Sequence, residues 1–313
     1  MRIGIALPAR VQFDTIPDFA RRAEELGFDL ISSGEHVFFH EPAPNGLVAL
    51  AAAAGATEHI RLLSSLTLLP TYPAPLLAKM VATLDGVSRG RFEFGVGVGG
   101  EYPSEIRACN VDPQTRGAYT DEALELIRAL FTGEPVTHVG RFFTVEGERL
   151  TPPPVQRPGP PIWIGGRKRP AIRRGGRFAD VWMPHFMEPA QVAFSLAEVR
   201  GAAVEAGRRA EAVAGAYIAW TNADRNDQRA RATGVEVLSG FYNQDLSRVA
   251  DKYLVLGSPA RLVDRFLEYF EAGAETILIG LTCLEQDTMA TLELIAADVV
   301  PPLRKQAANG GTS

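Results

Sequence analysis

Residues 1–36 read MRIGIALPARVQFDTIPDFARRAEELGFDLISSGEH, which is an apolar run, an amphipathic stretch and a second apolar run. The runs Arg2–Ala6 and Asp29–Ser33 have the length and residue types of buried strands. Between them, apolar residues recur at three- and four-residue spacing over Ile16–Leu26, and Gly27 follows as a helix stop signal. This stretch therefore predicts two parallel strands joined by a helix, the βαβ unit.

The same alternation continues along the rest of the chain. Further strands are predicted over Arg61–Leu66, Phe92–Val98, Pro161–Ile164, Asp180–Met183, Val213–Ala219 and Thr276–Gly280, with helices over Gly46–Ala54, Pro75–Val87, Ala118–Phe131, Ala190–Ala206 and Ala260–Ala272. Eight β/α alternations without a linker rich in glycine and serine favour an α/β fold, a TIM (β/α)8 barrel, as a single domain over residues 1–308. The small, polar residues 309–313 are expected to form a disordered tail.

Two stretches interrupt this rhythm and are expected to be insertions on the carboxyl-end face of the barrel. Glu134–Pro160 is rich in proline and predicts an extended excursion with a short hairpin. Thr221–Gly257 is polar and is expected to contain at least one helix of its own. Because loops on this face usually contact the substrate, the second insertion is a candidate lid.

Composition narrows the function classes. The 313 residues are 46% hydrophobic and 22% charged, as in ordinary globular proteins with a sizeable core. Lys and Arg number 32 against 37 Asp and Glu, so the net charge of −5 argues against nucleic-acid binding. No apolar run approaches the roughly 20 residues that span a membrane, and no secretory signal pattern is visible, so a cytoplasmic location is expected. The two cysteines, Cys109 and Cys283, are expected to be small buried hydrophobic residues.

The active sites of barrel enzymes lie where the strands end, so the residues after each predicted strand are the candidates. His36 follows the second strand, and Phe38 beside it could enclose a flat ligand. The alternative is that His36 only hydrogen-bonds a backbone carbonyl. Ser64 and Ser65 end the third strand and either allow a ring to approach the backbone or form a tight packing site.

The fourth strand is rich in glycine, which indicates close approach by a ligand or by a neighbouring strand. It is not a dinucleotide fingerprint, because Pro103 soon follows where a phosphate-binding helix should begin. Glu101, just beyond this strand, is either a proton donor or acceptor beside the ligand or a solvated surface carboxylate.

The fifth strand ends in Gly165, Gly166, Arg167 and Lys168, just before a helix. Exposed amides, cations and a helix N-terminus together favour an anion such as a phosphate, with a solvated basic loop as the weaker alternative. His185 also lies past a strand end and is expected to line the substrate pocket. The histidines and cysteines are not spaced as a ligand set, so no metal is predicted.

Several ordered blocks of the sequence are similar to the bacterial luciferase-like superfamily. They are LGFDLISSGEHVFF, ATEHIRLLSSLTLLPTYPAPLLAK, ATLDGVSRGRFEFGVGVGGEYPSEI, RGAYTDEALELIRALFTGEP, PPPVQRPGPPIWIGG, FADVWMP and LGSPARLVDRFLEYFEAGAETILI, and they cover nearly the whole chain. The resemblance implies a TIM barrel that binds reduced FMN or the deazaflavin coenzyme F-420 across the carboxyl ends of the strands. It also implies that the cofactor phosphate lies near strand five.

The resemblance also assigns roles to individual residues. His36 matches the catalytic histidine near the reactive face of the ring, and Ser65–Leu66 matches a non-proline cis peptide that supports the ring. Arg116 and the stretch Gly165–Lys168 match the groups that approach the phosphate. Glu101 aligns with the acidic residue of deazaflavin-dependent sugar-phosphate dehydrogenases only after one extra glycine is allowed. Gly97 and Val98 stand where luciferase has cysteine and arginine, which argues against light emission.

The resemblance implies an enzyme that uses reduced FMN and oxygen to insert one oxygen atom into a small organic substrate, a monooxygenase. The alternative is hydride transfer with coenzyme F-420, with His36 and Glu101 as the proton-handling pair. A second alternative is a flavin-binding protein or subunit without catalysis. Phe38, Tyr72 and His185 are expected to line the substrate pocket. A separate reductase as the source of reduced coenzyme and a homodimer are also expected.

Overall fold

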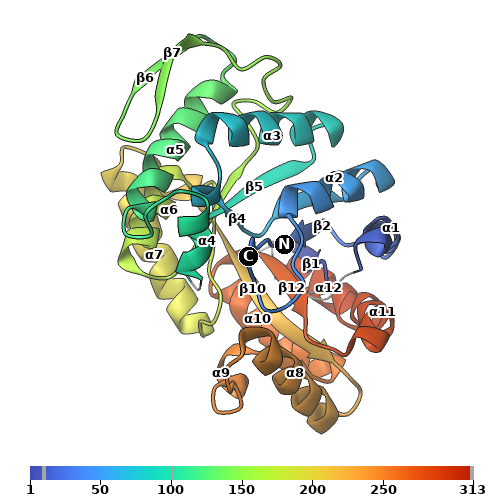
Figure 1. Ribbon diagram of the computed structural model, residues 1–313. Helices are drawn as coiled ribbons and strands as arrows, with labels where there is room; N and C mark the ends of the chain where they lie inside the picture. Colours follow the sequence, from blue (N-terminus) through green and yellow to red (C-terminus); the bar gives the residue numbers. More distant parts are fainter. Residues whose placement is uncertain (9–11, 101, 311–313) are drawn as a thin grey trace.

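Eight parallel strands close into a barrel (Figure 1). The computed structural model describes residues 1–8, 12–100 and 102–310. Around the barrel the strands follow the order β1 (Arg2–Ala6), β2 (Leu30–Ser33), β3 (Arg61–Ser64), β5 (Phe92–Gly97), β8 (Ile162–Gly165), β9 (Val181–Met183), β10 (Ala214–Ala223) and β12 (Ala274–Leu281). The barrel closes between β12 and β1, where Gly4 pairs with Leu278. The predicted TIM barrel is therefore confirmed.

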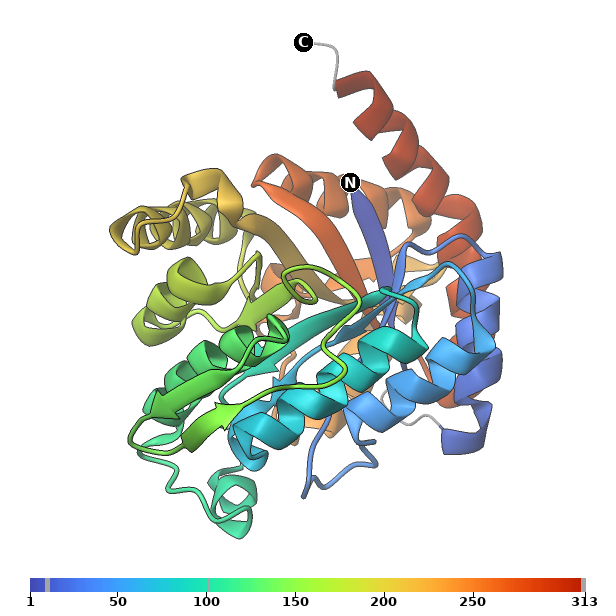
Figure 2. The same ribbon diagram turned by 90° about the horizontal axis from the view of Figure 1, so that it is seen from above.

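Helices surround the barrel as an outer layer (Figure 2). The helices of the described chain are α1 (Ile16–Glu25), α2 (Gly46–Ala56), α3 (Ala74–Val87), α4 (Pro103–Ala108), α5 (Arg116–Phe131), α6 (Arg169–Phe178), α7 (Pro189–Glu205), α8 (Asp227–Tyr242), α9 (Ala250–Tyr253), α10 (Pro259–Glu271), α11 (Thr288–Asp298) and α12 (Val300–Gly310), of which α4 and α8 lie at the carboxyl-end mouth of the barrel. Short 3-10 helices are η1 (Phe13–Thr15), η2 (Leu69–Thr71), η3 (Ala210–Ala212) and η4 (Glu285–Asp287). Several helices begin where a side chain satisfies a free backbone N–H, as Asn45 does for Val48 at the start of α2.

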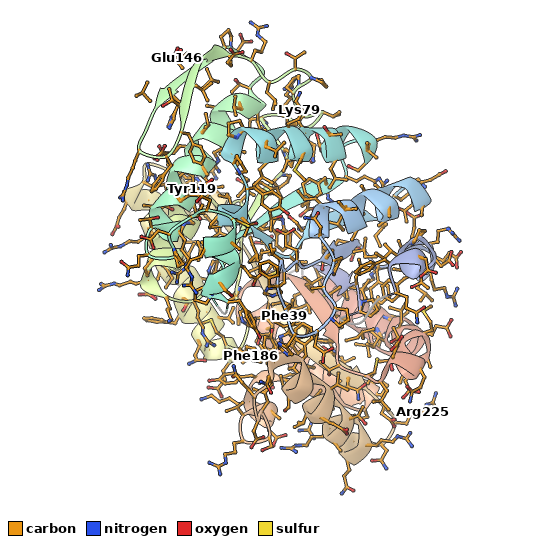
Figure 3. All side chains as sticks on the ribbon, viewed as in Figure 1. Phe39, Lys79, Tyr119, Glu146, Phe186 and Arg225 are labelled. Atoms are coloured by element: carbon orange, nitrogen blue, oxygen red, sulfur yellow. The ribbon has the colours of Figure 1, made fainter. Side chains whose placement is uncertain are left out.

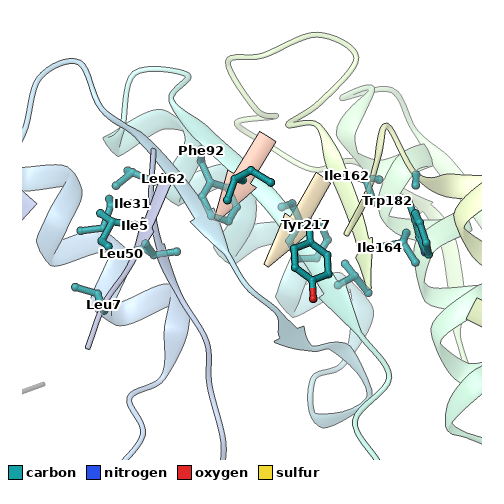
Figure 4. Packing of buried hydrophobic residues seen from close by; sticks show 14 of the residues in the cluster. Ile5, Leu7, Ile31, Leu50, Leu62, Phe92, Ile162, Ile164, Trp182 and Tyr217 are labelled. Carbon is teal, nitrogen blue, oxygen red and sulfur yellow. The ribbon is translucent and has the colours of Figure 1, made fainter. Parts of the chain in front are cut away.

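The core has two layers because side chains alternate between the two faces of each strand. The outer layer packs strands against helices and includes Ile5, Ile31, Leu62, Ile164 and Trp182 (Figure 4). The inner layer fills the barrel with Leu30, Leu63, Trp163, Val181, Met183, Ala216 and Leu278. Towards the carboxyl end of each strand, the next side chain that points inward therefore lies at the mouth of the barrel.

The two predicted insertions differ in how well their boundaries were predicted. The stretch Glu134–Pro160 contains the expected hairpin, β6 (Val136–Val139) and β7 (Thr144–Glu148). The stretch Thr221–Gly257 was predicted to be wholly an insertion, but β10 continues to Ala223 and pairs with β11 (Val255–Gly257). Another short strand, β4 (Thr67–Leu68), pairs with β5 beyond the end of β3. Polar residues such as Thr221 and Asn222 concealed the end of β10, since a buried strand was expected to be apolar.

The remaining expectations concern the chain end and the cysteines. Helix α12 includes Asn309 and Gly310, which were expected to belong to the tail, and residues 311–313 lie outside the described part. Both cysteines are free and half-buried, so the expectation of full burial was wrong. In the described part of the chain, no helix has the length and apolar character needed to cross a membrane.

Candidate active site

Glycines line the inner face of the barrel where β5 and β8 end, and the side chain of Leu66 occupies the space beside them. A Cβ atom on Gly165 would lie 2.2 Å from Leu66 Cδ1, and one on Gly97 would lie 3.3 Å from Leu66 Cβ. The peptide bond between Ser65 and Leu66 is cis, as the resemblance implied. Gly97, Gly165 and Leu66 thus form a surface at the mouth of the barrel, here called the glycine floor.

The two serines at the end of β3 differ in what they offer a ligand. Ser64 is fully buried, and its Oγ donates to Gly95 O at 3.0 Å and accepts from Gly95 N at 2.9 Å. Its hydroxyl therefore joins β3 to β5, and the expectation that Ser64 binds the cofactor stays a prediction. Ser65 is half-buried and donates to Ser32 Oγ at 2.9 Å, at the level of the glycine floor.

His36 is held by a buried carboxylate that sequence reasoning missed. Its Nδ1 lies 2.9 Å from Oε1 of Glu105, a residue of α4 whose side chain is only 2% exposed. The other oxygen of Glu105 accepts hydrogen bonds from the backbone N–H groups of Val37 and Phe38. The partner of His36 is thus a carboxylate rather than a backbone carbonyl. Pro103 is the first residue of α4, a position at which proline is favoured, so the use of Pro103 as an argument against a helix start here was wrong.

Aromatic rings continue from His36 across the mouth. The imidazole stacks on Phe39 with the ring centroids 4.3 Å apart, and Phe39 contacts Phe241 of α8 at 5.1 Å. Phe241 contacts Trp220 of β10 at 6.0 Å. On the same helix, Tyr242 contacts Phe186, and Figure 3 shows Phe39 and Phe186 on the side of the barrel nearest to α8. The predicted lid region therefore contributes α8 to the wall of the candidate site.

Cationic groups and helix N-termini gather on another side of the mouth. Gly166 has a φ of 103°, and Lys168 is the last residue before α6, where its side chain makes no hydrogen bond with the first backbone N–H groups of the helix. Lys168 is exposed, whereas Arg167 donates from Nη1 to Phe186 O at 2.8 Å. Arg116 begins α5, and α5 contacts α6 at this end because Arg174 donates to Gly117 O. These groups create a positive region that suits an anion.

Within the described residues, four buried side-chain atoms lack a hydrogen-bond partner: Arg116 Nε, Trp220 Nε1 and the hydroxyl oxygens of Thr67 and Thr282. Buried polar atoms in native proteins almost always have a partner. Arg116 Nε belongs to the positive region described above. Trp220 follows Ala216 and Ile218 on the inner face of β10, and its ring packs over Gly280. The predicted strand ended at Ala219, which is why Trp220 was missed.

The other predicted site residues are arranged as follows. His185 is half-buried after β9, and burial together with the charge of Arg167 lowers its pKa to about 4. Phe38 is 56% exposed. The hydroxyl of Tyr72 donates to buried Glu35 at 3.0 Å and accepts from Asn45, so it connects the loops that carry these residues, and its place in the substrate pocket stays a prediction. Glu101 lies outside the described residues.

An open groove of about 430 Å³ lies elsewhere, on the outer surface between α7 and the end of α10. Leu196, Val204 and Gly273 line it, near the amino end of β12. It contains none of the groups described above, so the barrel mouth is the candidate site.

Comparisons with known proteins show the family and support the fold. The family model described as luciferase-like monooxygenase matches residues 1–276. A monooxygenase from Streptomyces bottropensis is 25% identical, with a TM-score of 0.84 over 96% of this chain and 99% of that one. The coenzyme F-420-dependent tetrahydromethanopterin reductase of Methanopyrus kandleri is 19% identical, with a TM-score of 0.79 over 96% and 99%. The oxygenating constituent of 3,6-diketocamphane monooxygenase from Pseudomonas putida, in complex with FMN, is 21% identical, with a TM-score of 0.74 over 96% and 98%.

Proposed function

Because this chain belongs to the luciferase-like monooxygenase family, we propose that it uses reduced FMN and molecular oxygen to oxygenate a small organic substrate. One arrangement carries the proposal. An imidazole held by a buried carboxylate lies at one side of a glycine-lined mouth, and a positive region lies at another, where Arg116 Nε has no hydrogen-bond partner among the described residues.

The residues of the mouth fit a flavin mononucleotide. Ser65, Leu66 and the glycines of β5 and β8 would support the flat ring, because Leu66 is the side chain nearest to the Cβ positions of Gly95, Gly97 and Gly165. Arg116 Nε, the backbone at Gly166 and the N-terminus of α6 would hold the phosphate through charge-assisted hydrogen bonds. When bound, reduced FMN supplies the electrons that activate oxygen.

The chain's own side chains would then position the substrate and handle protons. His36 would accept a proton at Nε2, the nitrogen that does not face Glu105. Trp220 Nε1 would donate to an oxygen of the substrate, since it has no partner within the described chain. The rings of Phe39 and Phe241 would exclude water from the mouth.

The test combines coenzyme binding with isotope incorporation. The purified protein is titrated with FMN and with coenzyme F-420, in oxidised and reduced forms, and then supplied with reduced FMN, labelled ¹⁸O₂ and a panel of cyclic ketones. The proposal expects ¹⁸O in one product and loss of that product in His36→Ala. Binding of FMN without oxygen-dependent product from a broad panel would contradict it.

A second candidate is hydride transfer with coenzyme F-420, and one observation favours it. Lys168 and Arg169 are exposed beside Arg167, which is more positive charge than one phosphate requires. Coenzyme F-420 carries an additional acidic tail that these cations would bind. Anaerobic turnover with reduced coenzyme F-420, and none with reduced FMN, would select this candidate. In either case we expect a separate reductase to supply the reduced coenzyme.

We also propose a homodimer that buries α2. The sequence of this helix, GLVALAAAAGA, is apolar on every face, although only one face packs on the barrel. Val48 on its outer face is 65% exposed, and Leu76 and Val87 of neighbouring α3 are 53% and 54% exposed. A helix that is hydrophobic all round is normally buried, and a second copy of the chain is the partner expected here.

A further inference from the structure

We infer that Glu105 is a positioning residue that fixes the tautomer of His36, an inference that rests on the role proposed above for His36. Glu105 accepts three donors with two oxygens. Oε2 accepts from the backbone N–H groups of Val37 and Phe38, and Oε1 faces His36 Nδ1 at 2.9 Å. The side chain is 2% exposed, so water does not replace these partners.

The carboxylate decides which ring nitrogen carries the proton. An ionised carboxylate can only accept hydrogen bonds, so the facing Nδ1 must be the protonated nitrogen of a neutral imidazole. Nε2 is then left with its lone pair, and the described residues give it no hydrogen-bond partner. The stacking of the imidazole on Phe39, with an angle of 11° between the rings, holds the plane of the ring.

Glu105 is itself held in place by the packing of α4. The neighbouring Ile106 is 1% exposed, and its Cδ1 lies 3.2 Å from the position of a Cβ on Gly99. Glu105 also bonds the two residues that follow His36, so one carboxylate orients both the ring and the loop that carries it. Glu105 is therefore the group that orients the imidazole of His36, although the two residues lie 69 positions apart in the sequence.

The variant Glu105→Gln tests the inference because it replaces the hydrogen-bond acceptor that faces Nδ1 of His36 with a hydrogen-bond donor. The N–H groups of Val37 and Phe38 can only donate, so the amide oxygen of the glutamine must face them. Its NH₂ group then faces Nδ1, which must accept, and the proton moves to Nε2. We therefore expect the favoured neutral tautomer of His36 to change from Nδ1–H to Nε2–H, with an excess of about tenfold in each protein.

The measurement is two-dimensional NMR of the chain labelled with ¹⁵N-histidine, titrated to the alkaline plateau without coenzyme or substrate. The chain has five histidines, and the signals of His36 are identified as the set that is lost in His36→Asn. Glu122→Gln is the matched control. Glu122 likewise accepts from backbone N–H groups, those of Arg141, Phe142 and Phe143, and faces His138 Nε2 at 3.3 Å. This control should leave the signals of His36 unchanged.

Each outcome decides the inference. An Nε2–H tautomer of His36 in the unaltered protein overturns it, even if Glu105→Gln does not fold. So does a folded Glu105→Gln protein that keeps the Nδ1–H tautomer. A reversed tautomer supports the inference, and turnover should then fall by about 10²–10⁴-fold with coenzyme binding unchanged. If His36→Ala keeps full turnover although the tautomer reverses, the proposed role of His36 fails while the positioning by Glu105 stands.

Discussion

Replacement of Arg116 by methionine tests whether the positive side of the mouth binds the phosphate of the coenzyme. The Nη1 group of Arg116 already donates to Pro113 O, whereas the buried Nε has no partner among the described residues. Nε and Nη2 form the edge of the guanidinium that binds a phosphate with two parallel hydrogen bonds. Methionine keeps most of the apolar stem and removes this edge.

The size of the effect follows from the number of bonds lost. A hydrogen bond to a charged group contributes about 1.5–3 kcal/mol. Because about 1.4 kcal/mol corresponds to a factor of ten in Kd, each lost bond should weaken FMN binding by about 10- to 150-fold, and loss of both bonds in Arg116→Met by about 10²- to 10⁴-fold. The Kd of Arg116→Lys for FMN should lie between those of the unaltered protein and Arg116→Met, since lysine keeps the charge but lacks the planar guanidinium group.

The assay compares FMN with riboflavin, which has the same ring but no phosphate. Fluorescence titration of both ligands against the unaltered protein and Arg116→Met gives a thermodynamic cycle. The loss should be confined to FMN, and it should shrink as salt is added. Arg107→Met, which removes an exposed arginine of α4, is the control for a general change in charge.

Two results would refute this reasoning. Equal losses for FMN and riboflavin would mean that Arg116 shapes the loop after Pro113 and does not contact the phosphate. Unchanged binding of FMN would mean that another acceptor satisfies Nε. For coenzyme F-420, the same comparison can be made with 8-hydroxy-5-deazariboflavin, which also lacks the phosphate.

Three further predictions concern packing, pH and assembly. Gly165→Ala places a Cβ atom 2.2 Å from Leu66 Cδ1, so urea denaturation should show a loss of about 1–3 kcal/mol. Gly201→Ala, with nothing within 4 Å of its Cβ position in α7, should instead gain up to about 1 kcal/mol, and equal effects would contradict the packing argument. Because the pKa of His185 is lowered to about 4, its contribution to stability is complete above pH 6.5 and is lost as the pH falls towards 4. His185→Asn should therefore remove at most about 3 kcal/mol of pH dependence in that window, and parallel stability curves for the two proteins would rule out the lowered pKa. Val48→Glu places a charge on the outer face of α2, so sedimentation should show a monomer in place of a dimer, and an intact dimer would exclude this interface.

The sequence by itself determined the β/α alternation and therefore the barrel. Each strand such as Arg2–Ala6 or Asp29–Ser33 is a local run of apolar residues, and each helix has its own periodicity and stop signal. It also indicated that His36 and the residues around Gly165 lie at one end of the barrel, because the carboxyl ends of parallel strands share one face. Arg116 was added to this set only by the family resemblance. These conclusions need only local patterns and the geometry of a closed parallel sheet.

Only the tertiary structure decided which side chains meet. The contact between His36 and Glu105 joins a loop to a short helix, and spacing along the chain carries no signal for it. The same applies to Ser64, whose hydroxyl is taken up by the backbone of Gly95, and to Tyr72, whose hydroxyl binds Glu35. The physical reason is that a polar group selects its partner from everything that packing brings within about 3 Å, and packing depends on the whole fold.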